Sequence, residues 1–500
     1  MENGPPPGAR TWPANRQGRR TVTWVVLSVV VVSAGIVAIR AGLRGNAMPG
    51  GPGPAPTARA RPNVVLIVTD DQRWNSLFAM PNVERYLVRR GVTFTNAFVT
   101  TSLCCPSRAS ILTGEYSRHT GVYNDSGGPH GGAPAFKDTS TLATWLHGVG
   151  YDTALVGKYM NSYNLIAHHI PPGWSHWDAI DSAKPALHYY DYAINEDGQL
   201  HYYGSDPSDY VDTVLGHLGT QFLATARPPF FLEFCPTAPH APAIPAPGDE
   251  QRFHVPLPYR PNFNEADMSD KPWAGMFPRF ARTGFITRFW DQQLDSLQQV
   301  DRTVGAFVRV LRIDGQLANT VFVFTTDNGI LLGEHRLAIV KVWPYEESIR
   351  VPLVIAGAGV VDPGRTNPDF ALNIDLAPTI AQLAGVRPGL PVDGRSLVPL
   401  MMNRHPPWRT SFVVEYLGNG GAGDDYVAPF EGIRTLRYLY VRYGRLRVRV
   451  GGPLVPYPNG SEELYDLKSD PYELRNLARL PQYQQLRARL AGQLARLLRR

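Results

Sequence analysis

Short runs of β-branched and other apolar residues recur between residues 63 and 357, and segments with helical spacing lie between them. The runs read NVVLIVT, DTALVGK, FFLEFCP, VFVFTT and VPLVIAG. Continuous apolar runs of this kind are typical of strands that are buried on both faces of a parallel sheet. A helical pattern covers residues 83–90, and from Trp290 to Leu311 apolar residues recur at steps of three and four, which predicts a long amphipathic helix. We therefore expect an α/β fold in which helices flank a large, mainly parallel sheet.

The pattern changes after about residue 403. The segments RTSFVVEYL, GIRTLRYLYVRYG and RLRVRVGG alternate apolar residues with arginine or tyrosine, which is typical of a half-exposed antiparallel sheet. The closing segment, LPQYQQLRARLAGQLARLLRR, has helical spacing with a basic face. We therefore divide the globular part into a main domain at residues 61–402 and a smaller C-terminal subdomain at residues 403–500. The subdomain is expected to combine an antiparallel sheet with a terminal helix.

The N-terminal part contains the most apolar segment of the sequence. Residues 21–39, TVTWVVLSVVVVSAGIVAI, are long enough to span a bilayer core as a helix. Arginines in residues 1–20 precede this run, so the positive-inside rule places that basic tip in the cytoplasm. We interpret residues 21–41 as a membrane anchor, with a cleavable signal segment as the alternative, and the Gly- and Pro-rich residues 42–60 as a flexible linker. The globular part is then extracytoplasmic, either held at the cell membrane or secreted.

Charge and cysteine content narrow the classes of function. The formal net charge is +6, but the surplus lies largely near the two ends, and no basic stripe with interleaved aromatic residues appears between them. We therefore expect no nucleic-acid partner. The three cysteines, Cys104, Cys105 and Cys235, are too few for a disulfide framework in an exported protein. The two adjacent cysteines need another explanation.

Oxygen-bearing side chains follow two of the predicted strands. Asp70 and Asp71 come directly after VVLIVT, and Asp327 and Asn328 come directly after VFVFTT. The carboxyl ends of parallel strands converge on one edge of a sheet, which is the usual place for a site. Four oxygen donors without a nearby ligand histidine suit a hard cation, and we predict calcium, with magnesium second.

The adjacent cysteines lie in the segment SLCCPSRASILTG, residues 102–114. This segment resembles the CxPSR motif and the following LTG that mark the nucleophile of the sulfatase family. Only Cys104 has the required spacing to Pro106 and Arg108, because Cys105 would place proline immediately after it. The resemblance implies that a formylglycine-generating enzyme oxidises Cys104 to formylglycine during export. ASILTG predicts that a helix begins here, and a helix N-terminus suits an anionic ester.

The resemblance covers nearly everything from Pro62 to Ala478, and CCPSRASILTG looks most like the N-acetylglucosamine-6-sulfatase branch. It implies an alkaline phosphatase/sulfatase-like fold and a sulfuric ester hydrolase. It also implies that Asp70, Asp71, Asp327 and Asn328 bind the metal ion together with the modified residue at position 104.

Hydrolysis of a sulfate ester needs cationic donors that neutralise the sulfate and the charge on its leaving oxygen. Candidates for catalysis stand at positions that resemble sulfatase motifs: Arg108 in CCPSR, Lys158 in GYDTALVGKY, His240 in PTAPHAP and Lys341 in DNGILLGEHRLAIVK. His335, in the same last segment, is a candidate for substrate binding. Taken singly, a lysine is usually a surface residue and a histidine beside prolines is usually structural. These assignments therefore rest on the resemblance.

One position departs from the pattern of many arylsulfatases, which carry a histidine two residues after the first lysine. Here that position is Met160, in GKYMN. The N-acetylglucosamine-6-sulfatase branch has a similar KYxN pattern, so we expect Asn161 to contact substrate and the substrate to be a sulfated sugar. Three alternatives stay open: an arylsulfatase, a phosphonate monoester or phosphodiester hydrolase of the same superfamily, and a surface protein that binds sulfated glycans without cleaving them.

Overall fold

The computed structural model describes residues 61–184, 187–276, 279–418, 427–444, 447–449, 454–456 and 460–499. The predicted basic tip, membrane segment and linker, residues 1–60, lie outside these described residues. No helix in the described part of the chain is long and apolar enough to cross a bilayer.

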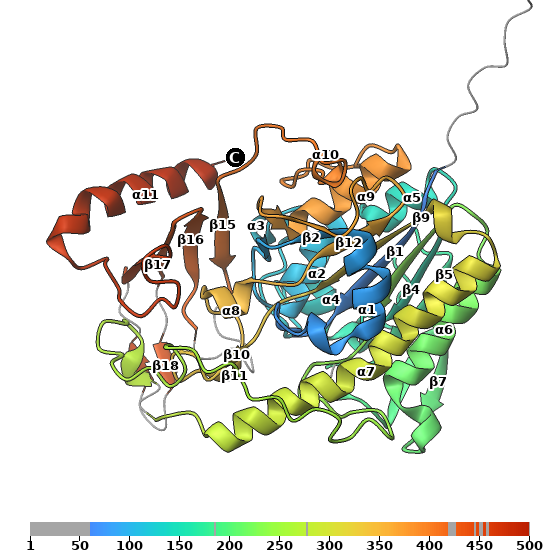
Figure 1. Cartoon of the computed structure of the whole chain (residues 1–500), viewed down its shortest axis with the longest axis horizontal. Coiled ribbons are helices and arrows are strands. Elements are labelled where there is room, and N and C mark those ends of the chain that lie inside the picture. The colour runs from blue at the N-terminus through green and yellow to red at the C-terminus, as the bar shows by residue number, and fades with distance from the viewer. Residues whose placement is uncertain are drawn as a thin grey trace, which may run out of the picture. The chain divides into compact units, whose positions relative to one another are not determined.

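A ten-stranded sheet forms the centre of the main domain (Figure 1). Its order is β13-β2-β12-β9-β1-β8-β4-β5-β6-β7. Strands β9, β1, β8, β4 and β5 run parallel to one another, whereas β12 and β6 run antiparallel to their neighbours. The strands are β1 Asn63–Thr69, β2 Gly91–Phe94, β4 Asp152–Gly157, β5 His176–Ile180, β6 Tyr192–Glu196, β7 Gln199–Tyr203, β8 Phe230–Cys235, β9 Thr320–Thr326, β12 Val354–Gly357 and β13 Arg365–Asn367. The expectation of a mainly parallel sheet is confirmed.

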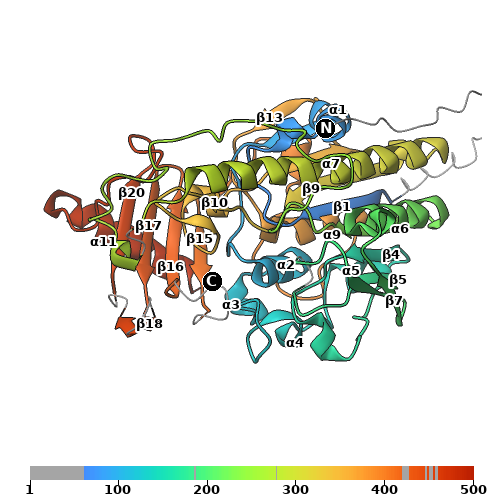
Figure 2. The same ribbon diagram turned by 90° about the horizontal axis from the view of Figure 1, so that it is seen from below.

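Helices cover both faces of this sheet (Figures 1 and 2). On one face, Val65 and Ile67 of β1 belong to a buried cluster with residues of α1, α6 and α7. On the other face, Leu66 and Val68 of β1 are buried with residues of α2, α5 and α9. The helices are α1 Pro81–Tyr86, α2 Cys104–Thr113, α3 Ser117–Thr120, α4 Gly132–Ala135, α5 Leu142–His147, α6 Val211–Thr225, α7 Thr283–Ile313, α8 Glu346–Ile349, α9 Leu376–Ala384, α10 Val398–Met401 and α11 Gln484–Leu497.

The structure sharpens two of the helical predictions. The long amphipathic helix is α7, which extends beyond the predicted range at both ends. The pattern at residues 83–90 is not one helix but α1 followed by a 3-10 turn at Val88–Arg90. The chain must turn into β2 at Gly91, where a Cβ atom would lie only 2.4 Å from the carbonyl oxygen of Ile355. Only a glycine allows this close approach of β2 to β12.

The C-terminal subdomain is a four-stranded antiparallel sheet with α11 against one face. Its order is β15-β16-β17-β20, formed by Ser411–Tyr416, Phe430–Thr435, Tyr438–Tyr443 and Glu462–Asp466. Leu490 and Leu494 of α11 are buried with Val413 and Ile433 of the sheet. This confirms the predicted small sheet with a terminal helix. The segment RLRVRVGG contributes instead β18, Arg447–Arg449, which pairs with β19, Leu454–Pro456, in a separate ribbon.

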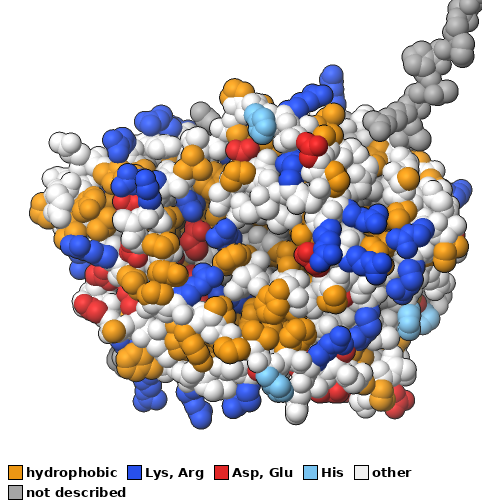
Figure 3. Space-filling model, in the orientation of Figure 1, with side chains coloured by type: hydrophobic (Ala, Val, Ile, Leu, Met, Phe, Trp, Pro, Cys, Tyr) orange, Lys and Arg blue, Asp and Glu red, His pale blue; other side chains and the backbone are white. Residues whose placement is uncertain are grey.

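Basic side chains gather over α1 and α7 on the face that Figure 3 shows. Arg85 and Arg312 lie 5.2 and 5.7 Å from the centroid of the Tyr86 ring, and Arg90 lines the same surface groove as Arg312. The sequence did not indicate this cluster, because its arginines come from two segments that are far apart in the chain.

Candidate functional site

The two oxygen-bearing pairs meet at the carboxyl edge of the sheet. Strands β1 and β9 pair in parallel with Thr69 opposite Thr326, so Asp70 and Asp327 leave neighbouring strand ends together. The backbone N–H of Asp71 donates to Asp327 Oδ1 at 3.2 Å. Asp71 has a φ of 61°, in the left-handed region, where a non-glycine residue is strained. Such strain is common where a backbone is bent to aim a functional side chain.

Cys104 is the first residue of α2 and is 1% exposed. Its Sγ lies 3.5 Å from Asp70 Oδ1 and 2.7 Å from Lys341 Nζ. Cys105 faces elsewhere: it is part of a hydrophobic cluster, and its Sγ accepts a hydrogen bond from the backbone N–H of Asn161 at 3.2 Å. The structure therefore separates the two cysteines, with Cys104 in the polar site and Cys105 in the core.

Three cations predicted from motifs converge on the aspartates. Lys158 Nζ lies 2.5 Å from Asp70 Oδ2, and Lys341 Nζ lies 2.6 Å from Asp71 Oδ1. Arg108 Nε donates to Asp327 Oδ2 at 2.9 Å. Each of these pairs joins residues that are far apart in sequence, so the sheet edge assembles them.

Gly157, the last residue of β4, positions Lys158. Its φ is +114°, and a Cβ atom there would lie 2.0 Å from the carbonyl oxygen of Cys235. Only glycine fits this close contact between β4 and β8. The backbone N–H of Lys158 donates to the same Cys235 carbonyl at 2.8 Å, which fixes the start of the lysine side chain.

His240 contributes a nitrogen to the same site. Its Nδ1 lies 2.6 Å from the carbonyl oxygen of Ala241, which can only accept, so Nδ1 carries a hydrogen. In the neutral imidazole, the lone pair is then on Nε2, which lies 3.5 Å from Asp71 Oδ2. This nitrogen is available as a metal ligand or as a proton acceptor.

The residues present fit a hard divalent cation. One ligand atom from each of Asp70, Asp71, Cys104 and His240 lies within 4.8 Å of the others. Asn328 Nδ2 donates to Asp71 Oδ1 at 2.6 Å, and within the described part of the chain its buried Oδ1 has no hydrogen-bond partner. A buried amide oxygen without a donor is the kind of atom that a cation satisfies. The expectation that no histidine lies near these oxygen donors is wrong, because His240 lies among them.

The buried charged groups of the site shift one another's pKa values. Burial alone raises the pKa of Asp70, but Lys158, His240 and Arg108 outweigh it and bring that pKa to about 2. Burial alone lowers the pKa of Lys341, but the charge of Asp71 outweighs it, so this pKa lies well above its usual value. Burial and the charge of Asp70 raise the pKa of the Cys104 thiol well above normal. The unmodified cysteine is therefore a neutral thiol and a poor nucleophile.

The two residues predicted to bind substrate lie in different surroundings. Among the described residues, the buried Oδ1 of Asn161 has no hydrogen-bond partner, and its backbone contacts Cys105 beside the nucleophile. His335 is fully buried elsewhere, with Nδ1 2.6 Å from Glu265 Oε2. Its contacts do not link it to Cys104, and its substrate-binding role stays a prediction. Met160 is buried in the hydrophobic cluster that contains Cys105.

Asp125 is a further residue at the start of α2, and no motif in the sequence indicates it. Its Oδ1 accepts a hydrogen bond of 2.7 Å from the backbone N–H of Cys105, in the first turn of α2. It thereby satisfies one of the free N–H groups at this helix start. Asp125 lies in NDSGG, a segment whose composition indicates only a turn, so no signal in the sequence distinguishes it.

A residue at a helix start, with cations and oxygen ligands around it at the carboxyl edge of a parallel sheet, is an arrangement typical of a hydrolase for anionic esters. Comparison with known families specifies the class. The family model described as Sulfatase matches residues 62–386, and the one described as N-sulphoglucosamine sulphohydrolase, C-terminal, matches residues 333–500. The chain belongs to the sulfatase family of hydrolases.

Two curated relatives illustrate the similarity. The chain is 33% identical over 389 residues to the N-acetylglucosamine-6-sulfatase of Homo sapiens, and the match covers 74% of this chain and 70% of that protein. It is 35% identical over 379 residues to an extracellular sulfatase SULF-1 homolog of Drosophila melanogaster. That match covers 72% of this chain but spans only a third, 33%, of the relative.

Solved structures show the same fold. The structure of BT4656 in complex with its substrate, D-glucosamine-2-N,6-O-disulfate, gives a TM-score of 0.73 at 23% identity, covering 87% of this chain and 97% of that one. A phosphonate monoester hydrolase of Agrobacterium radiobacter gives a TM-score of 0.68 at 22% identity, covering 87% and 95%. At these identities the likeness concerns the fold alone.

Proposed function

We propose that this protein hydrolyses the sulfate ester of a sulfated sugar similar to N-acetylglucosamine-6-sulfate, with formylglycine made from Cys104 as its nucleophile. The observation that carries the proposal is the position of Cys104 at the start of α2, with Lys341 Nζ 2.7 Å from Sγ and Asp70 Oδ1 3.5 Å from it. The choice of a sugar is supported by the relatives named as N-acetylglucosamine-6-sulfatases.

The residues around position 104 divide the work of binding and proton transfer. Formylglycine, once formed and hydrated, supplies a geminal diol as nucleophile in place of the neutral thiol. Lys158 and Arg108 are buried cations that would neutralise the sulfate group. Lys341 lies closest to the nucleophile and keeps its proton in the free protein, so it is placed to donate to the leaving oxygen. His240 is the second candidate for that step, once its Nε2 has taken up a proton.

We assign the metal as calcium, with magnesium second. Asp70, Asp71, Asp327 and Asn328 would hold it together with position 104. A bound divalent cation supplies fixed positive charge that stabilises an anionic nucleophile and polarises the ester. In the present arrangement Asp327 Oδ2 is engaged by Arg108, so this carboxylate would have to serve both partners.

Three alternatives to a sugar sulfatase remain. The fold similarity to a phosphonate monoester hydrolase favours phosphonate monoesters or phosphodiesters as the second candidate. An arylsulfatase is less favoured, because Met160 is a buried apolar residue where many such enzymes have a histidine. A glycan-binding protein without activity is least favoured, because the complete set of charged groups would serve no purpose. Turnover of an aryl sulfate, a sugar 6-sulfate and a phosphodiester by the purified protein separates these classes.

We further propose that the catalytic domain works outside the cytoplasm. Residues 21–41 tether it to the membrane, or it is released if that segment is cleaved. Its partner in maturation is a formylglycine-generating enzyme. The support is the apolar run in the sequence and the relatives named as extracellular sulfatases. If residues 21–41 tether the protein, the full-length chain should be found in the membrane fraction of cells and should need detergent to leave it.

The adjacent cysteines offer a matched test of the nucleophile. Cys104→Ser should lower kcat on a sugar 6-sulfate by at least about 10³-fold, because serine cannot form the diol, while thermal unfolding stays near that of the wild type. Cys105→Ser, in the core, should retain most of the activity. The mass of the peptide that contains residue 104 should show an aldehyde in the wild-type protein. A purified Cys104→Ser protein with full activity would overturn the proposal.

A further inference from the structure

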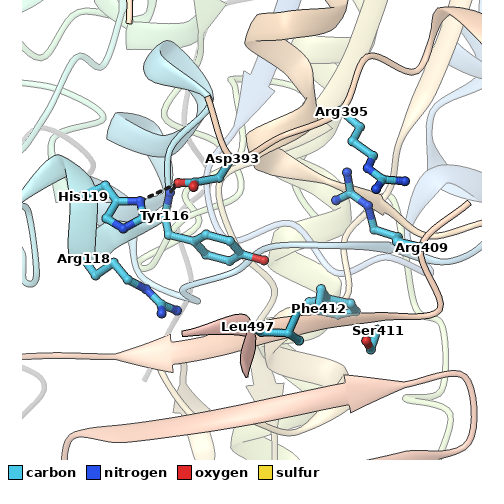
Figure 4. Close-up of a pocket in the computed structure, with 9 residues that line it drawn as sticks. All are labelled: Tyr116, Arg118, His119, Asp393, Arg395, Arg409, Ser411, Phe412 and Leu497. Carbon is cyan, nitrogen blue, oxygen red and sulfur yellow. Dashed lines mark hydrogen bonds and ion pairs between the residues drawn. The ribbon is translucent and has the colours of Figure 1, made fainter. Parts of the chain in front are cut away.

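A polar cavity lies between the main domain and the C-terminal subdomain, beyond the C-terminal end of α2. Figure 4 shows the residues that line it. Its volume of about 120 Å³ far exceeds the ~10–15 Å³ that one water molecule needs. Because α2 begins at Cys104 and its ten residues rise about 15 Å, this cavity is separate from the site described above. The residues that line it are Tyr116, Arg118, His119, Asp393, Arg395, Arg409, Ser411, Phe412 and Leu497.

The acidic groups at this cavity are already engaged. Asp393 Oδ2 accepts from the backbone N–H of Tyr116 at 2.8 Å and lies 2.8 Å from His119 Nδ1. Arg409 Nη2 donates to the buried Asp375 Oδ1 at 2.7 Å. Arg118 likewise lies 2.7 Å from the buried Glu415. The acceptors are therefore occupied by groups of the protein itself.

Several donors remain without such a partner. Ser411 Oγ accepts from Gln493 Nε2 at 3.0 Å, and Tyr116 Oη accepts from the backbone N–H of Val413 at 3.4 Å, so each hydroxyl hydrogen is left to donate elsewhere. Burial raises the pKa of Tyr116 to about 12, which keeps its hydroxyl protonated. Arg118 Nε is buried with no hydrogen-bond partner among the described residues.

Arg395 adds a charge that the structure does not balance. In the described part of the chain, its guanidinium makes no ion pair with a carboxylate, although its backbone N–H donates to Asp375 Oδ1 at 2.7 Å. Figure 4 shows the side chains of Arg395 and Arg409 at the same side of the cavity. The cavity is thus lined by two guanidinium groups, of which Arg409 shares its charge with Asp375, and by two hydroxyl groups. A tetrahedral oxyanion accepts charge-assisted hydrogen bonds from donors of this kind.

We propose that this cavity, with Arg395 and Arg409 as its main cations and Tyr116 and Ser411 as its hydroxyl donors, binds a sulfate group. The donors alone fit any tetrahedral oxyanion, and the choice of sulfate rests on the proposed function. The sulfate has two sources: the free ion, which the reaction releases, or a further sulfate group on a sulfated glycan. The cavity has room for the oxyanion and a few waters.

Arg395 provides the test, because it is exposed and its loss leaves no buried carboxylate unpaired. Equilibrium dialysis of the full chain against radioactive sulfate, at ionic strength held constant with chloride, should detect one site in addition to the active site. Arg395→Gln should weaken that additional site about tenfold, as expected for the loss of charge-assisted hydrogen bonds. Arg395→Lys should keep part of the affinity. Arg387→Gln, an exposed arginine away from the cavity, is the matched control.

Hydrolysis of a small sulfate ester by Arg395→Gln should equal that of the wild type, which shows that the variant is folded and separates this test from that of the proposed function. Competition with a sulfated oligosaccharide distinguishes the sources. If the oligosaccharide displaces the radioactive ion at lower concentration than free sulfate does, the site is for the glycan; if not, it is for the ion. Identical sulfate binding by Arg395→Gln, Arg387→Gln and the wild type would overturn the proposal.

Discussion

The site at Cys104 and a second buried cluster, around His335, are built from the same kinds of side chain but arranged differently. In the His335 cluster, Lys271 Nζ lies 3.0 Å from Glu265 Oε1 and His335 Nδ1 lies 2.6 Å from Glu265 Oε2, so both oxygens of one carboxylate are occupied. Nearby, Glu463 accepts hydrogen bonds from Trp273, Tyr345, Tyr443 and Tyr465. At Cys104, by contrast, oxygen, sulfur and nitrogen atoms from four residues converge on one another.

The difference shows that residue type and burial do not by themselves identify a functional site. Burial lowers the pKa of His335 well below its usual value, so its imidazole is neutral, and its ring lies 4.3 Å from that of Tyr345. In this position a neutral histidine packs on an aromatic ring and pairs with Glu265. Both clusters contain a buried atom without a hydrogen-bond partner among the described residues, Asn328 Oδ1 and His335 Nε2. What distinguishes the site at Cys104 is that potential ligand atoms from four residues converge there.

Among the variants that compare the two clusters, the largest effect is expected at Lys341. Lys341→Met keeps the length of the side chain but removes the cation next to Cys104 Sγ and Asp71. We expect kcat on a sugar 6-sulfate to fall by about 10²–10⁴-fold, because the leaving oxygen loses its proton donor. Steady-state kinetics and urea unfolding on the same preparation provide the measurement. A kcat within tenfold of the wild type would show that another group, with His240 the first candidate, protonates the leaving oxygen.

Lys271 is the buried lysine of the His335 cluster, and its loss should lower stability without changing kcat. Lys271→Met leaves the carboxylate of Glu265 without its ion pair in a buried position. Breaking such a pair costs about 3 kcal/mol or more of unfolding free energy, whereas kcat per folded molecule should stay unchanged. Adding Glu265→Gln to this variant should restore part of the stability. A loss of kcat at unchanged stability would instead move this cluster into the catalytic machinery.

Much of the fold follows from local sequence patterns. The apolar runs gave β1, β4, β8, β9 and β12, and the three- and four-residue spacing gave α7, because burial on both faces of a sheet or on one face of a helix dictates those periods. The positions of Asp70 and Asp327 follow from the parallel pairing of β1 with β9. The division of the chain at residue 403 stays a prediction.

The rest depends on how distant segments meet. His335 and Lys341 are close in sequence, but His335 and Arg336 both have positive φ, 52° and 62°, in the turn between β10, Leu331–Leu332, and β11, Ala338–Val340. That turn directs the two side chains into different clusters, which a linear motif cannot show. The contact between Asp125 and the start of α2 also arises only in three dimensions.

The smallest expected effect is the change in unfolding free energy when calcium is added, which should depend on the site at Cys104 and not on the His335 cluster. After chelation, added calcium should raise the unfolding free energy of the wild type by about 2.7 kcal/mol when its concentration is 100 times the dissociation constant, because the ion binds only the folded protein. Asp71→Asn removes a carboxylate charge from the site at Cys104 and should abolish most of this gain. Glu265→Gln, the matched change in the His335 cluster, should keep it. If both variants respond to calcium as the wild type does, the ion binds elsewhere. If magnesium stabilises the wild type more than calcium does, the metal is magnesium, and its site is still the one at Cys104.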